Sequence, residues 1–227
     1  MLANNNEAII NKLAKNSVKT NKKQYAILFF TIILSAFMLF CVFTIGMTYL
    51  NSSRLQNTRL NGAEYDIVTM NGFTSEQLNT LQQNENIRSV GIESYAGFIQ
   101  STEYDKTVEI GLLWCDEVFW DNLMSPARTK LDGHYPQNKN ELMVTKDILK
   151  TCGNENLSVG DSLILTYENN TGVYTDEFVI SGIWDGYGDT SAGFVSKAFY
   201  DETGYDLKNN GILCIKLNCN YVFPTTI

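Results

Sequence analysis

An uncharged apolar run near the N-terminus constrains this chain more than any other feature of its sequence. Residues 25–50 read YAILFFTIILSAFMLFCVFTIGMTYL and contain no Asp, Glu, Lys or Arg. About 20 apolar residues span the hydrocarbon core of a bilayer as a helix, and tyrosines at both ends suit the headgroup layer. A cleaved signal peptide has a shorter apolar core, of roughly 7–15 residues. We therefore predict a transmembrane helix over residues 25–50.

Charge is distributed unequally on the two sides of this run. Residues 1–24 contain five of the chain's 17 lysines and arginines and only one acidic residue, Glu7. The other 12 basic residues and 24 of the 25 acidic residues lie at or beyond Arg54. Because positive charge marks the cytoplasmic side of a span, we predict a cytoplasmic segment 1–24 and an extracytoplasmic domain 51–227. So acidic a domain argues against nucleic acid as a partner.

The basic segment also has a helical pattern. At about 100° per residue its apolar side chains occupy one half of a helical wheel and its lysines cluster on the other. The apolar set is Ile9, Ile10, Leu13, Ala14 and Val18. This pattern predicts an amphipathic helix that lies on the inner face of the lipid bilayer, with its lysines toward anionic headgroups. A disordered basic tail that only sets the topology is the alternative.

Beyond the run, short strands and short helices follow one another without strict alternation, which indicates an α+β domain. Strands are expected over residues 63–70, 86–100, 106–116, 140–145, 161–167, 176–184 and 210–218. Helical segments are expected over residues 73–83, 116–124, 146–152 and the second part of 192–206. Thr74 and Gln77 form a capping-box pattern at the first of these helices. The polar segment 51–62 is expected to continue the membrane helix as a stalk, and a loop is expected around Pro126 and Pro136.

Turn and strand-start signals follow one another in a fixed order through the second half of the chain. They are Gly133 and Pro136 in a Gly-x-x-Pro loop, Glu141 after Asn140, the turn Gly160-Asp161, and Gly182 in a late strand. This order, together with the basic preamble and the apolar run, resembles the MacB/FtsX-type permeases of ABC transporters. The resemblance implies that these positions have structural roles and that the chain belongs to a bacterial cell membrane.

The resemblance also carries expectations about function. It implies a membrane-anchored permease subunit whose outer domain contacts exported substrate or partner proteins, and which works with a separate ATP-binding cassette ATPase subunit. A homodimer is one alternative for its assembly. Permeases of this type have further membrane helices after the outer domain, so the absence of a second apolar run implies a fragment or a truncated product. The alternative function is a single-pass extracytoplasmic sensor or adhesion domain of a surface receptor.

The sequence contains no constellation typical of an enzyme, so we predict no catalytic residue, no cofactor site and no metal site. The single histidine, His134, would have to be the sole base of any triad, and no Gly-x-x-x-x-Gly-Lys phosphate loop occurs. Neighbouring acids are expected to be solvated surface in so acidic a domain. They are Asp105, Asp116, Glu117 and Asp121, and the pair Asp185 and Asp189, whose spacing lacks the register of a calcium loop.

Four cysteines follow the apolar run: Cys115, Cys152, Cys214 and Cys219. Four thiols would allow two disulfides in three connectivities. Cys214 and Cys219 are an odd number of residues apart in a strand-like segment, so their side chains are expected on opposite faces. We therefore expect small buried hydrophobic residues rather than a disulfide framework.

Overall fold

The computed structural model describes residues 7–100, 110–187 and 192–218, and the chain divides into two compact units, Met1–Arg54 and Leu55–Ile227. The first unit contains α1 (Glu7–Thr20) and most of α2 (Lys22–Asn61). The predicted amphipathic segment is therefore helical, and the stalk does continue the apolar helix. Among the described residues, α2 is the one helix long and apolar enough to cross a membrane, with a mean hydropathy of 2.8 over its most apolar stretch.

The second unit is a mixed α+β domain, as predicted. Its strands are β1 (Ile67–Thr69), β2 (Ile87–Ile99), β3 (Ile110–Cys115), β4 (Arg128–Gly133), β5 (Glu141–Thr145), β6 (Ser162–Asn169), β7 (Gly172–Gly186), β8 (Ala192–Val195) and β9 (Gly211–Leu217). Its α-helices are α3 (Ser75–Gln82), α4 (Lys146–Thr151), α5 (Lys197–Tyr200) and α6 (Leu207–Asn210). A π-helical turn (Val118–Leu123) and a 3₁₀ turn (Ser125–Ala127) complete it.

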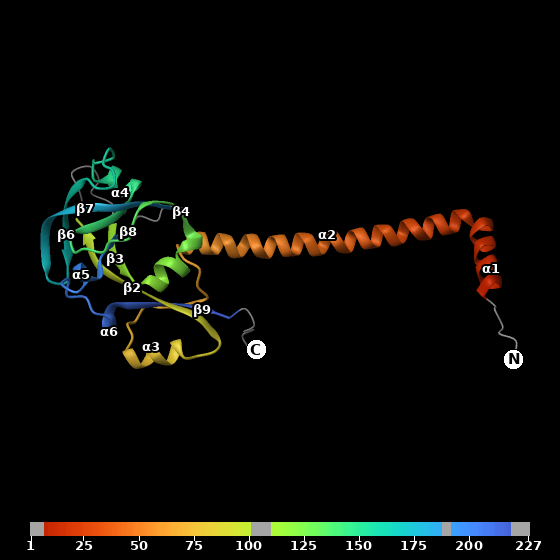
Figure 1. The fold of residues 1–227 in the computed structure, drawn as a ribbon, viewed down its shortest axis with the longest axis horizontal. Helices are drawn as coiled ribbons and strands as arrows, with labels where there is room; N and C mark the ends of the chain where they lie inside the picture. The colour runs from red at the N-terminus through yellow and green to blue at the C-terminus, as the bar shows by residue number, and fades with distance from the viewer. Residues whose placement is uncertain (1–6, 101–109, 188–191, 219–227) are drawn as a thin grey trace. The chain divides into compact units, whose positions relative to one another are not determined.

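Six of the strands pair in a closed ring. The pairings run from β2 through β3, β8, β5, β7 and β6 and return to β2. Figure 1 shows these strands wrapping around a common interior. β9 pairs with the other edge of β2, β1 pairs with β9, and β4 pairs with β7. The result is one strongly curled nine-stranded sheet.

Helix starts follow from local capping. The predicted box at α3 is present, because the Thr74 hydroxyl accepts from the Gln77 amide and the Gln77 side chain accepts from the Thr74 amide. Thr145, Ser196 and Asp206 cap α4, α5 and α6 in the same way, each through its side-chain oxygen. These caps explain why helices as short as four residues begin at defined positions.

Hydrophobic side chains form two cores on the two faces of the sheet. The first core fills the interior of the closed strands and contains Phe178, Ile180 and Leu142. The second core lies on the opposite face and contains Trp184, Phe194 and other residues that pack under the π-helical turn. β7 contributes side chains to both cores because it has a bulge at Ser181. At this bulge Leu142 of β5 pairs with Ile180, whereas the next residue of β5 pairs with Gly182, so Ser181 is left unpaired in the register. The extra residue reverses the alternation, so Ile180 faces one core and Trp184 the other.

Four expectations about elements were wrong in detail. Residues 128–133 form the edge strand β4 instead of a loop; all but Arg128 are exposed, so no apolar alternation marked the strand. The strand expected at 63–70 is reduced to Ile67–Thr69, and the helix expected within 192–206 ends at Tyr200. The connection between the strands expected over 161–167 and 176–184 is shorter than expected, because β6 extends to Asn169 and β7 starts at Gly172.

Candidate functional site

Two of the six motif positions form a close backbone contact between β4 and β7. Gly133 and Gly182 are paired across these strands. Gly133 has a φ of +88°, and a Cβ atom there would lie 2.2 Å from the Ser181 carbonyl oxygen. A Cβ atom on Gly182 would lie 2.9 Å from the His134 carbonyl oxygen. Only glycine fits this crossing, because each strand lies against the other's backbone.

Glu141 and Pro136 organise the loop that leads into β5. The Glu141 carboxylate accepts hydrogen bonds from the Gln137 amide at 2.7 Å, the Asn138 amide at 3.1 Å and the Asn138 side chain at 2.7 Å. Burial raises the pKa of Glu141, but these donors outweigh it and bring its pKa below the usual value. Pro136 is buried in the same loop. The three hydrogen bonds to this carboxylate therefore fix the loop before β5.

The turn at Gly160-Asp161 attaches the start of β6 to the middle of β7. The Gly160 amide donates to the Ile180 carbonyl at 2.8 Å, and the Ile180 amide donates to the Asp161 carbonyl at 2.9 Å. The Asp161 carboxylate accepts from the Ser158 amide at 2.8 Å. Gly160 has a φ of +94° and open space where a Cβ atom would lie, so its conformation alone favours glycine. Five of the six motif positions thus lie in backbone contacts with β7, and Pro136 lies buried in the loop before β5.

The other candidate residues that the structure describes do not form a reactive group either. The exposed His134 ring lies 3.0 Å from the Tyr135 carbonyl oxygen. The Asp116 carboxylate accepts from the amides of Ile92 and Phe119, which fixes the start of the π-helical turn. Asp105 and Asp189 lie outside the described residues. In the part of the chain that the structure describes, no three His, Cys, Asp or Glu side chains group as metal ligands.

The cysteines behave as buried apolar residues where they are described. Cys115, Cys152 and Cys214 are free and buried, as expected. Burial raises the pKa of each thiol, so the protonated form is favoured at neutral pH. Cys219 lies outside the described residues.

A buried lysine that was not predicted from the sequence forms two ion pairs near the start of the domain. Lys216 in β9 is 4% exposed, and its ammonium lies 3.1 Å from Glu64 and 3.3 Å from Asp66. The other Asp66 carboxylate oxygen accepts from the Leu217 amide at 2.9 Å. We call residues 64–66 and 215–217 the stalk junction, because residue 64 follows the end of α2 closely. A lysine in an apolar strand was the available signal, since a buried lysine requires an anionic partner.

A second missed residue is Glu93 in the middle of β2. It alternates with Ile92, which belongs to the interior core, and so lies on the face of the second core. Burial raises the pKa of Glu93 to about 7. Its charge in turn raises the pKa of Tyr65, Cys115 and Cys214, although burial is the larger cause in each case. This carboxyl group titrates near neutral pH beneath the π-helical turn.

The last turns of α2, which belong to the second unit, contact the domain through an arginine. The Arg59 guanidinium carbon lies 3.9 Å from the centroid of the Tyr187 ring, and its Nη2 donates to the Tyr187 hydroxyl at 3.3 Å. Thr58, on the same turn, is buried. Arg59 and the stalk junction together attach the start of the domain to its late strands β7 and β9.

The described part of the chain is an α+β domain that follows directly from a helix long and apolar enough to cross a membrane. No family model matches the sequence, and a search of curated proteins gives no match. Among solved structures, the periplasmic region of MacB from Actinobacillus actinomycetemcomitans is similar, with 14% identity, a TM-score of 0.44, and coverage of 69% of this chain and 76% of that chain.

Two further solved structures are similar at the same level. The extracellular domain of the ABC-type transporter YknZ from Gram-positive bacteria has 14% identity and a TM-score of 0.43, over 66% of this chain and 75% of that chain. A domain of a protein described as a permease from Porphyromonas gingivalis has 10% identity and a TM-score of 0.44, over 70% and 67% of the two chains.

Proposed function

We propose that this chain is a permease subunit of a MacB/FtsX-type ABC transporter, in which α2 crosses a bacterial plasma membrane and the second unit lies outside. The observation that carries this proposal is the stalk junction. β1, which follows the stalk, pairs antiparallel with β9, the last described strand, with Ile67 opposite Ile215. The first strand of the domain and its last described strand are therefore neighbours.

This geometry supports an insert between two membrane helices better than a receptor domain. A domain inserted between two packed membrane helices returns to the membrane near the point where it left, and neighbouring first and last strands suit that path. A sensor or adhesion domain at the end of a single span has no such requirement. The ion pairs of Lys216 hold the two segments together in the part where a second span would follow. The order of the six motif positions in the sequence supports the same proposal independently.

The stalk junction also suggests how the domain would work in a transporter. Arg59 on α2 contacts Tyr187 at the end of β7, and Lys216 on β9 contacts residues just beyond α2. A displacement of α2 is therefore passed to two strands of one curled sheet rather than to a flexible linker. We assign ATP hydrolysis to a separate ATP-binding cassette subunit in the cytoplasm and contact with substrate or partner proteins to the outer domain. We assign the chain itself no catalytic step.

Crosslinking from α1 tests this assignment. A photo-reactive amino acid at Asn11 or Lys15, both exposed on α1, should crosslink in cells to a protein that contains a phosphate-binding loop. The same residue at Ser158, on an exposed loop of the second unit, serves as the control and should give no such product. Crosslinks from α1 to a cytoplasmic signalling protein without a nucleotide-binding loop would favour the sensor alternative and contradict the proposal.

A further inference from the structure

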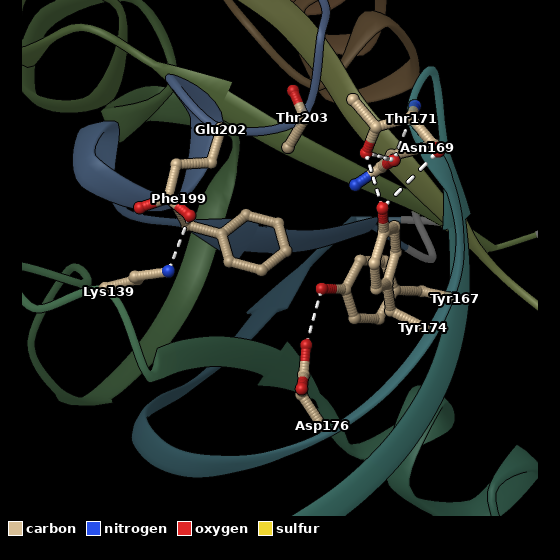
Figure 2. A pocket seen from close by; sticks show the side chains of 9 residues that line it. All are labelled: Lys139, Tyr167, Asn169, Thr171, Tyr174, Asp176, Phe199, Glu202 and Thr203. Carbon is tan, nitrogen blue, oxygen red and sulfur yellow. Dashed lines mark hydrogen bonds and ion pairs between the residues drawn. The ribbon is translucent and has the colours of Figure 1, made fainter.

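A small cavity opens beside the β6–β7 hairpin, on the side of α5. Its volume is about 240 Å³, which is smaller than the roughly 300–1,000 Å³ of sites for drug-sized ligands. The loop before β5, the hairpin, and the end of α5 all contribute to its walls (Figure 2). These are segments far apart in the sequence, so the cavity is a product of the fold. Its size suits one side chain or one small functional group.

Aromatic rings form the walls of this cavity. Tyr167 stacks on Tyr174 with ring centroids 5.9 Å apart, and Phe199 lies 5.4 Å from Tyr167. Tyr167 is buried, whereas Tyr174 is 41% exposed and so presents ring surface to a ligand. The face of a tyrosine ring attracts cations through its negative quadrupole. The walls therefore favour an apolar stem that carries a positive charge.

Two carboxylates flank the rings, and Figure 2 shows the Tyr167 hydroxyl directed at one of them. Asp176 accepts that hydroxyl at 2.6 Å through Oδ2. Glu202 accepts from Lys139 at 2.6 Å through Oε2. Within the residues that the structure describes, the other oxygen of each carboxylate has no hydrogen-bond donor. With Lys139 as the sole cation, the charged groups of the lining leave a net charge of −1.

Lys139 forms an ion pair with one of these two carboxylates. Its side chain places a primary ammonium on Glu202 at the edge of the cavity. Both partners of this ion pair are more than half exposed, at 57% and 63%. Exposed pairs of this kind contribute little to stability, so an external ammonium can take the place of Lys139 at small cost.

We propose that this cavity binds a primary alkylammonium group, with the ammonium between Asp176 and Glu202 and the alkyl stem against Tyr174. A lysine side chain of a peptide and a free alkylamine share this chemistry. An anionic ligand would be repelled by the net negative charge of the lining. The chain beyond residue 53 contains 24 acidic and 12 basic residues, and this net negative charge also attracts cations at long range. The inference does not depend on the transporter role.

Binding of matched probes to the full chain in lipid nanodiscs tests the inference. The probes are butylamine, Nα-acetyl-lysine methylamide, and the same lysine compound acetylated on Nε, followed by ligand-observed NMR. The first two should bind, and the third, in which a larger, uncharged amide replaces the ammonium, should bind at least about tenfold more weakly than the second. If butylamine binds and the lysine compound does not, the site accepts free amines rather than peptide side chains.

Variants locate the binding in this cavity. Lys139→Met removes the resident ammonium and should raise affinity about two- to fivefold. Asp176→Asn and Glu202→Gln should each lower it about tenfold. Lys146→Met and Glu177→Gln, which change exposed residues outside the cavity in the same way, should leave it unaltered. Equal binding of the charged and acetylated probes, or no binding by either the native chain or the Lys139→Met variant, would overturn the inference.

Discussion

Replacing Gly133 with alanine is expected to lower the free energy of unfolding of the second unit by about 3 kcal/mol or more. Two causes act together at this position. Its φ of +88° is unfavourable for a residue with a side chain, and the new Cβ atom would lie 2.2 Å from the Ser181 carbonyl oxygen. That oxygen belongs to the backbone of β7 and accepts from the His134 amide at 2.9 Å, so it cannot move without disturbing the pairing of β4.

Gly160→Ala is the matched control for this change. Gly160 has a similar φ of +94°, but a Cβ atom there would meet nothing within 4 Å. Its replacement should therefore cost about 1 kcal/mol, from backbone conformation alone. Denaturant unfolding of both variants, followed by circular dichroism, measures the difference. Equal losses would show that the close contact between β4 and β7 does not exist as described.

The double replacement Glu64→Gln and Asp66→Asn is expected to destabilise the domain by about 3 kcal/mol. It leaves the Lys216 ammonium buried without an anionic partner, and the desolvation of that charge is then uncompensated. This loss of stability is at the lower end of the range for breaking a buried ion pair, because the side chains of Glu64 and Asp66 are themselves 29% and 37% exposed. Thermal unfolding at pH 7 measures the loss.

Two comparisons separate this effect from a general loss of charge. Lys216→Met removes the cation and keeps an apolar stem, so it should cost clearly less than the double replacement. Glu202→Gln breaks an exposed ion pair and should change stability by less than about 1 kcal/mol. If the double replacement is no more harmful than Glu202→Gln, the stalk junction does not hold the first and last strands together.

Local signals allowed most elements of the fold to be predicted. The capping box at Thr74, the apolar run, and the short runs of apolar residues in β2, β5 and β9 each depend on neighbouring residues, and each is present. β4 was missed because an exposed edge strand needs no apolar residues, and because β7, with which it pairs, is distant in the sequence, as the pair Gly133 and Gly182 shows. The shift of faces at Ser181 was also invisible, since a bulge is set by pairing with another strand.

The sites were harder to predict than the elements. The motif glycines could be interpreted as turn residues, but no local pattern indicates that Gly133 and Gly182 lie opposite each other. Lys216 and Asp66 are 150 residues apart, and the cavity beside Tyr174 joins three separate segments. Contacts of this kind depend on the closed arrangement of strands, which a linear pattern of residues does not encode.

The proposed function requires that α2 carry the second unit to the outer side of the membrane. Labelling of single cysteines with a membrane-impermeant maleimide in intact cells tests this orientation, with the native cysteines replaced. Ser52→Cys lies just beyond the apolar run and Asn16→Cys just before it, and both positions are exposed. The positive-inside distribution of charge predicts that Ser52→Cys is labelled and that Asn16→Cys is labelled only after the cells are permeabilised. Labelling of Asn16→Cys but not Ser52→Cys in intact cells would contradict the proposed orientation and the function built on it.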